Sequence, residues 1–225
     1  MLNRSDADIQ QDIQAEFKWE PSLRSENIAL SVKNGVVTLA GYVDSYFDKW
    51  KAERVASRVK GVKAVANNIE VKLPSSSERP DPELAQAVVN ALRWNILVPH
   101  ENIKARVERG WVTLEGDVNW YYQKEEAERA VRRITGVRGV SNLVSVRVRP
   151  MPSDVKRKIK DALERGALFD AEHIEIEVEG SKVLLRGTVR SYAEKRDAER
   201  AARNAPGVSE VDNRLTVDVT MPAPI

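Results

Sequence analysis

Cysteine is absent from this 225-residue chain, and histidine occurs only as His100 and His173. Without cysteine the protein forms no disulfide bond, holds no metal through thiolates and has no cysteine nucleophile. The two histidines fall at different positions of the internal repeat described below. No Ser-His-Asp spacing, phosphate-binding glycine loop or metal motif accompanies them. We therefore expect a protein that is not an enzyme and that carries no cofactor and no metal.

Long hydrophobic runs are also missing. No apolar run approaches the roughly 20 residues that a membrane-spanning helix needs. The N-terminal residues are polar and lack the apolar core of a secretory signal. From these absences we expect a cytoplasmic protein, with peripheral contact at the inner membrane as the nearest alternative.

The chain has little excess charge of either sign. Its 36 basic and 34 acidic residues give a net charge of +2, spread almost evenly along the sequence. A dedicated nucleic-acid-binding domain carries a clear basic excess on one face or element. Nucleic acid is therefore not an expected partner.

One hairpin pattern occurs three times, at residues 28–43, 103–118 and 174–189. Hydrophobic and polar residues alternate toward a turn and away from it, which is typical of two antiparallel strands. Offsets of 75 and then 71 residues superimpose the repeats without a gap inside any unit, so the chain is built from three copies of one unit. The matched positions include a helix stripe, a glycine and an asparagine: Ile9, Leu84 and Val155; Gly41, Gly116 and Gly187; Asn67, Asn142 and Asn213.

Each unit reads as helix, strand, strand, helix, strand. Ser5 with Asp8 predicts a capping box for the first helix, and the second helix of the first unit is expected from about residue 44 to 60. The third strand is expected at residues 69–73, 144–148 and 215–219. We predict an α+β protein of three tandem units, at residues 4–74, 80–149 and 152–220. Each should be a three-stranded mixed sheet with two helices on one face.

These motifs resemble the BON domain, the module named for bacterial osmotically inducible and nodulation proteins. The resemblance is carried by a G-x-V-x-L-x-G-x-V hairpin, an Ala-Glu-Arg helix motif and a Gly-Val turn that leads to an asparagine. In the first unit these are Gly35 to Gly41, Ala52-Glu53-Arg54 and Gly61-Val62 to Asn67. The third unit departs from the pattern at its hairpin turn, where Gly180-Ser181 replaces X-Gly, so a different hairpin tip is expected there.

The resemblance implies phospholipid binding and a role in osmotic or other stress, and it supplies no catalytic residues. We therefore expect a stress-associated binding protein that contacts anionic phospholipid or a membrane surface. The alternative is a cytoplasmic module for protein–protein interaction or self-association without lipid contact. Small-ligand, ion and nucleic-acid binding rank behind both.

The candidate binding surface consists of side chains that depart from the shared core, chiefly aromatic residues and two hairpin arginines of the second unit. Such residues are explained by packing between units, by self-association or by insertion at a lipid headgroup layer. The recurring glycines are interpreted as structural residues that allow tight turns and close approach. The candidate residues are Trp19, Trp50, Trp94, Arg106, Arg109, Trp111, Trp120 and Tyr122.

Overall fold

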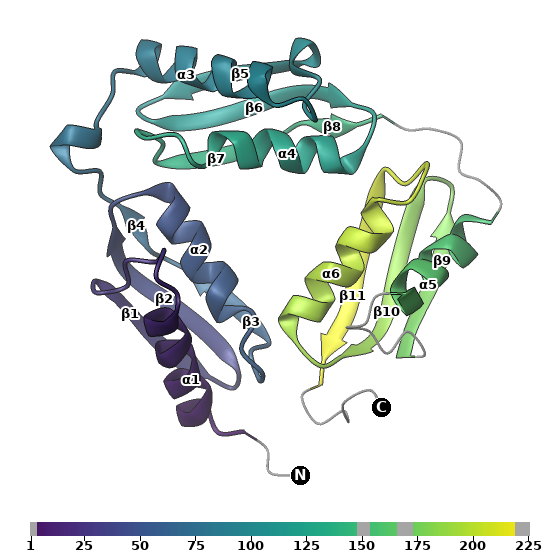
Figure 1. Cartoon of the computed structure of the whole chain (residues 1–225). Coiled ribbons are helices and arrows are strands. Elements are labelled where there is room, and N and C mark those ends of the chain that lie inside the picture. Colours follow the sequence, from purple (N-terminus) through teal and green to yellow (C-terminus); the bar gives the residue numbers. More distant parts are fainter. Residues whose placement is uncertain (1–3, 148–153, 166–172, 219–225) are drawn as a thin grey trace.

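The three repeats fold into three similar α+β units (Figure 1). The computed structural model describes residues 4–147, 154–165 and 173–218. The first unit comprises α1 (Asp6–Trp19), β1 (Ile28–Lys33), β2 (Val36–Val43), α2 (Tyr46–Ala56), β3 (Ala64–Asn67) and β4 (Glu70–Val71). After the short 3-10 turn η1 (Ser75–Ser77), the second comprises α3 (Asp81–Trp94), η2 (His100–Asn102), β5 (Ile103–Glu108), β6 (Trp111–Val118), α4 (Tyr121–Val131), β7 (Gly139–Asn142) and β8 (Ser145–Val146). The third comprises α5 (Val155–Arg165), β9 (Ile174–Glu179), β10 (Lys182–Val189), α6 (Tyr192–Arg203) and β11 (Glu210–Val217).

Each sheet is mixed, as predicted. The hairpin strands pair antiparallel, and the last strand of each unit pairs parallel to the second hairpin strand. In Figure 1 the two helices of each unit cover the same face of its sheet. In the first two units the last strand is divided into two short pieces, β3 with β4 and β7 with β8, whereas β11 is continuous.

Each unit has its own hydrophobic core between its helices and its sheet. In the first unit the i, i+4 stripe of α1 is buried, with Ile13 fully so, and it meets Val37 and Leu39 of β2. The second helix contributes small side chains, such as Ala52, which let its backbone lie close to the sheet. Full burial of a larger side chain such as Ile13 or Leu39 contributes about 1.5–3 kcal/mol relative to exposure.

The boundaries of the second helix and the third strand differ from those predicted. Helix α2 ends at Ala56, because the next amides bond three residues back, Arg58 to Val55 and Val59 to Ala56. The Gly61-Val62 turn then brings the amide of Lys63 to 2.9 Å from the carbonyl oxygen of Gly35. Parallel pairing therefore starts at residue 64, five residues before the predicted strand. The outer ends of the predicted third strands at 148 and 219 lie outside the described residues.

A recurring asparagine explains two of the sequence motifs together. The Asn67 side-chain amide donates to the carbonyl of Lys49, at 3.0 Å, and to the carboxylate of Glu53, at 3.2 Å. Its own carbonyl oxygen accepts from the amide of Ile69. Asn142 and Asn213 make the equivalent bonds in their units. The asparagine and the glutamate of the Ala-Glu-Arg motif therefore tie the last strand to the second helix.

The hairpin tips of the first two units are held by an aspartate of the preceding helix. The carboxylate of Asp81 accepts from the amides of Arg109 (2.7 Å) and Gly110 (2.9 Å), and Asp6 binds the first tip in the same way. Both turn residues have positive φ in these units, but only Gly180 does in the third, which confirms the expected difference. Pro152 replaces the aspartate in the third unit and lies outside the described residues.

The three units are arranged around a common centre, with α2, α4 and α6 facing inward (Figure 1). A tyrosine at the start of each of these helices reaches the next unit in a cyclic order. Tyr46 packs against the second core, Tyr121 lies under Arg203 of the third unit at 4.9 Å, and Tyr192 packs against the first core. The repeat in sequence therefore becomes an approximate threefold arrangement in space.

Candidate functional site

The junction between the first two units is built from aromatic rings and guanidinium groups. Arg132 lies 4.1 Å from the centroid of the Trp50 ring, and Arg133 lies 5.3 Å from that of Phe47. Phe47 and Trp50 are themselves neighbours, with centroids 5.9 Å apart. An arginine over an aromatic face gains electrostatic attraction as well as contact area. Trp50 therefore packs between units.

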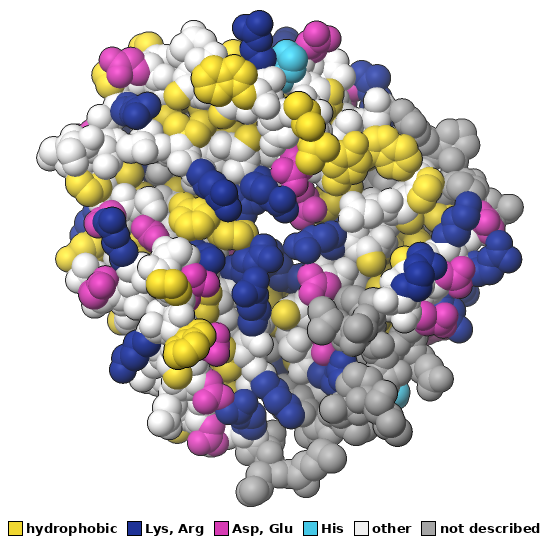
Figure 2. Space-filling model, in the orientation of Figure 1, with side chains coloured by type: hydrophobic (Ala, Val, Ile, Leu, Met, Phe, Trp, Pro, Cys, Tyr) yellow, Lys and Arg dark blue, Asp and Glu magenta, His cyan; other side chains and the backbone are white. Residues whose placement is uncertain are grey.

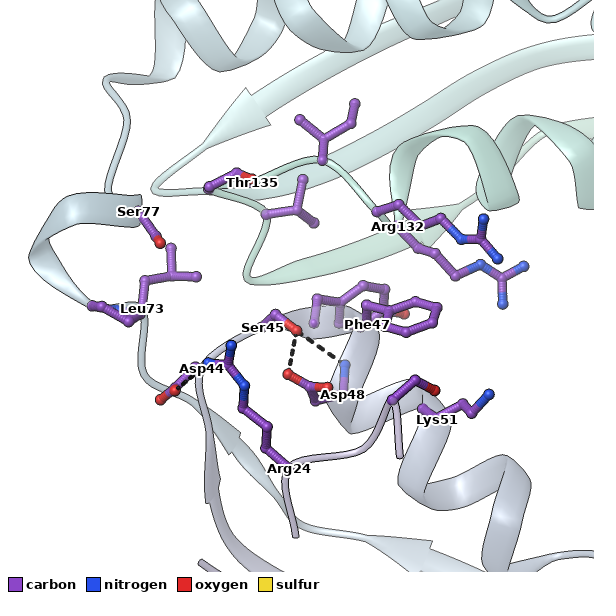
Figure 3. A pocket seen from close by; sticks show the side chains of 17 residues that line it. Arg24, Asp44, Ser45, Phe47, Asp48, Lys51, Leu73, Ser77, Arg132 and Thr135 are labelled. Atoms are coloured by element: carbon purple, nitrogen blue, oxygen red, sulfur yellow. Dashed lines mark hydrogen bonds and ion pairs between the residues drawn. The ribbon is translucent and has the colours of Figure 1, made fainter. Parts of the chain in front are cut away.

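Beside this junction lies a cleft of about 730 Å³, shown in Figure 3. One wall is the start of α2, where Ser45, Phe47 and Asp48 lie, and the other is the segment that follows α4, with Arg132 and Thr135. The cleft is therefore formed only when the two units are joined.

Some polar groups of the cleft are already engaged with one another. The Ser45 hydroxyl donates to the carboxylate of Asp48 at 2.6 Å and accepts from its amide, which caps α2. Arg24 pairs with Asp44 at 3.2 Å near the edge of the cleft. Burial lowers the pKa of the Arg132 guanidinium, an effect that nearby Glu128 opposes. These contacts are typical of a structural or binding surface rather than of an activated nucleophile with its base.

The most exposed of the predicted aromatic site residues are Trp19 and Trp94. They are 84% and 77% exposed and occupy equivalent positions at the ends of α1 and α3. Each follows an exposed basic residue, Lys18 or Arg93. In the second unit Ile96 and Leu97 continue the exposed apolar stretch and are 98% and 47% exposed. We call residues 93–97 the second-unit tip.

The predicted hairpin residues lie at the other end of the second unit. Because the hairpin turn binds Asp81, at the start of α3, it is separated from Trp94 by the length of that helix, about 20 Å. Trp111 lies flat over Gly139 of β7, and its indole nitrogen donates to the Ser141 hydroxyl at 2.9 Å. Arg106 and Arg109 are exposed. The structure does not bring these residues together with Trp94.

The last two predicted residues mark the start of α4. Trp120 is the N-cap residue and is partly buried, and its amide donates to the side chain of Gln123. Tyr122 is 41% exposed and occupies the position of Phe47 in the first unit. The eight predicted residues thus fall in at least three separate places, and Trp50 lies in the junction between the first two units.

Arginines that face the centre of the molecule were missed as site residues. Arg54 and Arg200 line one central cavity, and Arg54 and Arg129 line another. All three are the arginine of the Ala-Glu-Arg motif, which had been noted only as a mark of the fold. Their recurrence at one helical position was the available signal, but periodicity alone does not show that three helices converge.

No group of three or more His, Cys, Asp or Glu side chains in residues 4–147, 154–165 and 173–218 is placed to hold a metal ion. In the same part of the chain no helix has the length and apolar character required to cross a bilayer.

Comparison with known proteins agrees with the repeated architecture. The family model described as the BON domain matches residues 5–72, 80–148 and 153–219. Osmotically-inducible protein Y of Escherichia coli (strain K12) is 26% identical over 141 residues, which is 61% of this chain and 70% of that protein.

Two solved structures of CdsD, a structural protein of the type III secretion system of Chlamydia trachomatis, align at 16% identity. One alignment covers 94% of this chain and 92% of that one, with a TM-score of 0.27. The other covers 97% and 100%, with a TM-score of 0.26. The family matches extend over nearly the whole sequence and coincide with the three folded units. The chain belongs to the BON domain family, with three tandem copies of the domain.

Proposed function

We propose that this chain is a non-enzymatic, stress-associated binding protein that contacts anionic phospholipid through the ends of its first helices. Membership of the BON family and the similarity to osmotically-inducible protein Y support the stress-associated role. The observation that carries the lipid contact is the second-unit tip, where Trp94, Ile96 and Leu97 are exposed beside Arg93.

The chemistry of the second-unit tip suits a headgroup layer. Tryptophan favours the membrane–water interface, and a neighbouring basic side chain is attracted by anionic lipid. The tip is also ordered, since the Asn95 side chain accepts from the amide of Leu97 at 3.0 Å and the Asn95 carbonyl accepts from Val98. An ordered tip loses little conformational entropy on binding. Lys18 and Trp19 repeat the basic–aromatic pair in the first unit.

Co-sedimentation with vesicles tests this proposal. The wild-type chain should pellet with vesicles that contain anionic phospholipid at low ionic strength and should pellet less as salt rises. Replacing Trp94 by Ser should weaken pelleting about tenfold, and replacing Trp19 as well should weaken it further. Trp111→Ser is the matched control and should pellet like wild type. Absence of pelleting at low salt, or equal loss in the control, would overturn the lipid contact.

A second candidate, self-association, is favoured by the sheet faces that the helices leave uncovered. Tyr42 and Trp111 are 39% and 49% exposed there, next in sequence to the buried Val43 and Val112 on the helix side. Exposed aromatic residues on a flat sheet are typical of protein contacts. This function predicts a solution mass that is a multiple of 25.3 kDa, which falls toward 25.3 kDa when Trp111 is replaced by Ser. A monomeric wild-type protein would exclude it.

A further inference from the structure

The centre of the molecule is hollow and basic. Two cavities, of about 320 and 330 Å³, lie where α2, α4 and α6 converge, and Arg54 and Arg58 line both of them. Figure 2 shows an opening at the centre of the molecule, with lysine and arginine side chains and a few acidic ones around it. We call the two cavities together the central opening.

Cations dominate the lining of the central opening. Only one acidic residue, Asp197, contributes to the two described cavities. The basic residues that line them come from all three units and are Lys51, Arg54, Arg58, Arg129, Arg132, Arg133, Arg196 and Arg200.

Half of these cations have acidic partners. Arg129 pairs with Glu126 at 2.8 Å, and Lys51 pairs with Glu20 at 3.1 Å. Two pairs bridge units: Arg196 with Glu53, at 3.9 Å, and Arg200 with Glu125, at 3.5 Å. These four residues are therefore partly neutralised.

The other four cations form no such ion pair among the described residues. Within residues 4–147, 154–165 and 173–218, no carboxylate lies within 4.0 Å of the guanidinium groups of Arg54, Arg58, Arg132 and Arg133. Arg132 is only 8% exposed, and its Nε makes no hydrogen bond within the described part of the chain. Burial lowers the pKa of Arg54, and the neighbouring Arg58, Arg200 and Arg196 lower it further, while Asp197 opposes this shift. The cluster is a site of mutual repulsion that an anion would relieve.

Aromatic rings hold several of these groups in place before any ligand arrives. Arg132 and Arg54 lie 4.1 and 5.2 Å from the centroid of Trp50, and Arg133 lies 5.3 Å from that of Phe47. A guanidinium stacked on a ring keeps its edge N–H groups available, because the ring occupies only its face. Planar guanidinium forks match phosphate oxygens in pairs. The rings therefore pre-organise the arginines for a phosphate group.

We propose that the central opening binds a small anion that carries several linked phosphates. Four unpaired guanidinium groups exceed what one phosphate neutralises. The two cavities share Arg54 and Arg58, so a chain of phosphates can lie in both. The site exists only when the three units are packed around their common centre, because its arginines come from different units. This binding is separate from the proposed lipid contact at the second-unit tip and does not depend on it.

Titration calorimetry with inorganic triphosphate tests the site. The wild-type chain should bind one triphosphate per chain at about 0.15 M salt and should bind orthophosphate at least about tenfold more weakly. Arg54→Gln and Arg132→Gln should each weaken triphosphate binding about 10- to 100-fold, because each removes a charge-assisted pair of hydrogen bonds. Arg106→Gln removes the same charge from an exposed strand and should bind like wild type.

Folding of the variants is checked by urea unfolding. Arg54→Gln loses the stacking on Trp50 but also the repulsion from Arg58, Arg196 and Arg200, so its urea midpoint without an anion should stay close to that of wild type. A loss of triphosphate binding in this variant would therefore reflect the missing arginine in the central opening and not unfolding of the chain. Absence of binding by the wild-type chain, or an equal loss in Arg106→Gln, would overturn the proposal.

An additional experiment with vesicles distinguishes soluble phosphates from lipid headgroups as the ligand, since both carry phosphate groups. If the central opening takes soluble phosphates, a saturating amount of triphosphate should leave pelleting with anionic vesicles unchanged, and Arg54→Gln should pellet like wild type. Release from vesicles by triphosphate would instead assign the opening to headgroups and overturn the soluble-ligand proposal. Failure of all vesicle binding would contradict only the lipid function, since the calorimetric result stands by itself.

Discussion

The guanidinium of Arg132 lies 4.1 Å from the ring of Trp50, and the two residues belong to different units. This contact joins the second helix of the first unit to the segment that leaves the second helix of the next. It helps to hold the two units together and lies between the cleft and the central opening, since Arg132 lines both.

Replacing Trp50 by Ala should weaken this junction. The loss of the cation–π contact and of ring packing is expected to lower the free energy of unfolding by about 2 kcal/mol. The radius of gyration from small-angle X-ray scattering should increase as the two units separate. Trp19→Ala, at a position that is 84% exposed, should change stability by less than about 0.5 kcal/mol. A junction role would be refuted by equal effects of the two substitutions.

The junctions should also weaken at alkaline pH. Burial raises the pKa of Tyr46, with nearby Glu128 adding to the effect, and burial likewise raises the pKa of Tyr121. A tyrosine whose pKa is raised by folding stabilises the folded state fully below its ordinary pKa near 10, and this contribution is lost as pH rises through the folded pKa. The urea midpoint should therefore fall steeply above about pH 10.

Tyr46→Phe separates this effect from general alkaline denaturation. The variant should lose less than about 1 kcal/mol at neutral pH, because the ring keeps its packing against the second core and only the hydroxyl is removed. Its urea midpoint should then depend less on pH than that of wild type between about pH 9 and about pH 11. Tyr122→Phe is the control, because this ring is 41% exposed. Identical pH profiles for wild type and Tyr46→Phe would contradict the assignment.

Asn67→Ala should lower the free energy of unfolding by more than its partial exposure suggests. The substitution removes bonds to the Lys49 carbonyl, the Glu53 carboxylate and the Ile69 amide, and it leaves partly buried groups without partners. We expect a loss of about 1–3 kcal/mol in urea unfolding. Asn68→Ala alters the neighbouring exposed residue and should be close to neutral. Similar losses of stability for both variants would show that the hydrogen bonds of the Asn67 side chain do not stabilise the unit.

Gly41→Ala should be among the most damaging single substitutions in the first unit. A Cβ at this position would lie 2.1 Å from the carbonyl oxygen of Asn27, and the backbone has a φ of +105°. A clash with backbone cannot be relieved by a rotamer change, so the expected loss exceeds about 4 kcal/mol. Gly180→Ala is the informative comparison, because φ is +58° and nothing lies within 4 Å of the added Cβ. Gly180→Ala should lower the free energy of unfolding by about 1 kcal/mol. An equally small loss for Gly41→Ala would rule out the steric explanation.

Much of each unit was predictable because its signals are local in sequence. Capping by Ser5, the alternation around the hairpin turns and the Ile9, Ile13 and Phe17 stripe all depend on residues a few positions apart, and each is confirmed. The starts of the last strands were placed too late, because tight turns after the second helices shorten the connection. Long-range contacts are different: Asp81 is the first residue of α3, and its carboxylate binds the hairpin tip 28 residues away.

The positions of the predicted surface residues depend on contacts between units, which the sequence of one unit does not reveal. Trp19, Trp94 and Trp50 were grouped because each departs from the shared core. The structure leaves the first two exposed at helix ends and places Trp50 against a guanidinium of another unit. A helical projection shows that a side chain leaves its own core, but it does not show whether another surface receives it.

The sequence by itself therefore determined the unit: its strand order, its turns and its three cores follow from periodicity and from residues that must adopt particular backbone conformations. Tertiary structure alone decided how the units meet. The same Ala-Glu-Arg motif that marks the fold in each repeat places Arg54, Arg129 and Arg200 at a shared centre, where like charges from separate units lie close together. Repulsion and binding of that kind depend on distances between residues about 70 positions apart, and only the folded chain fixes those distances.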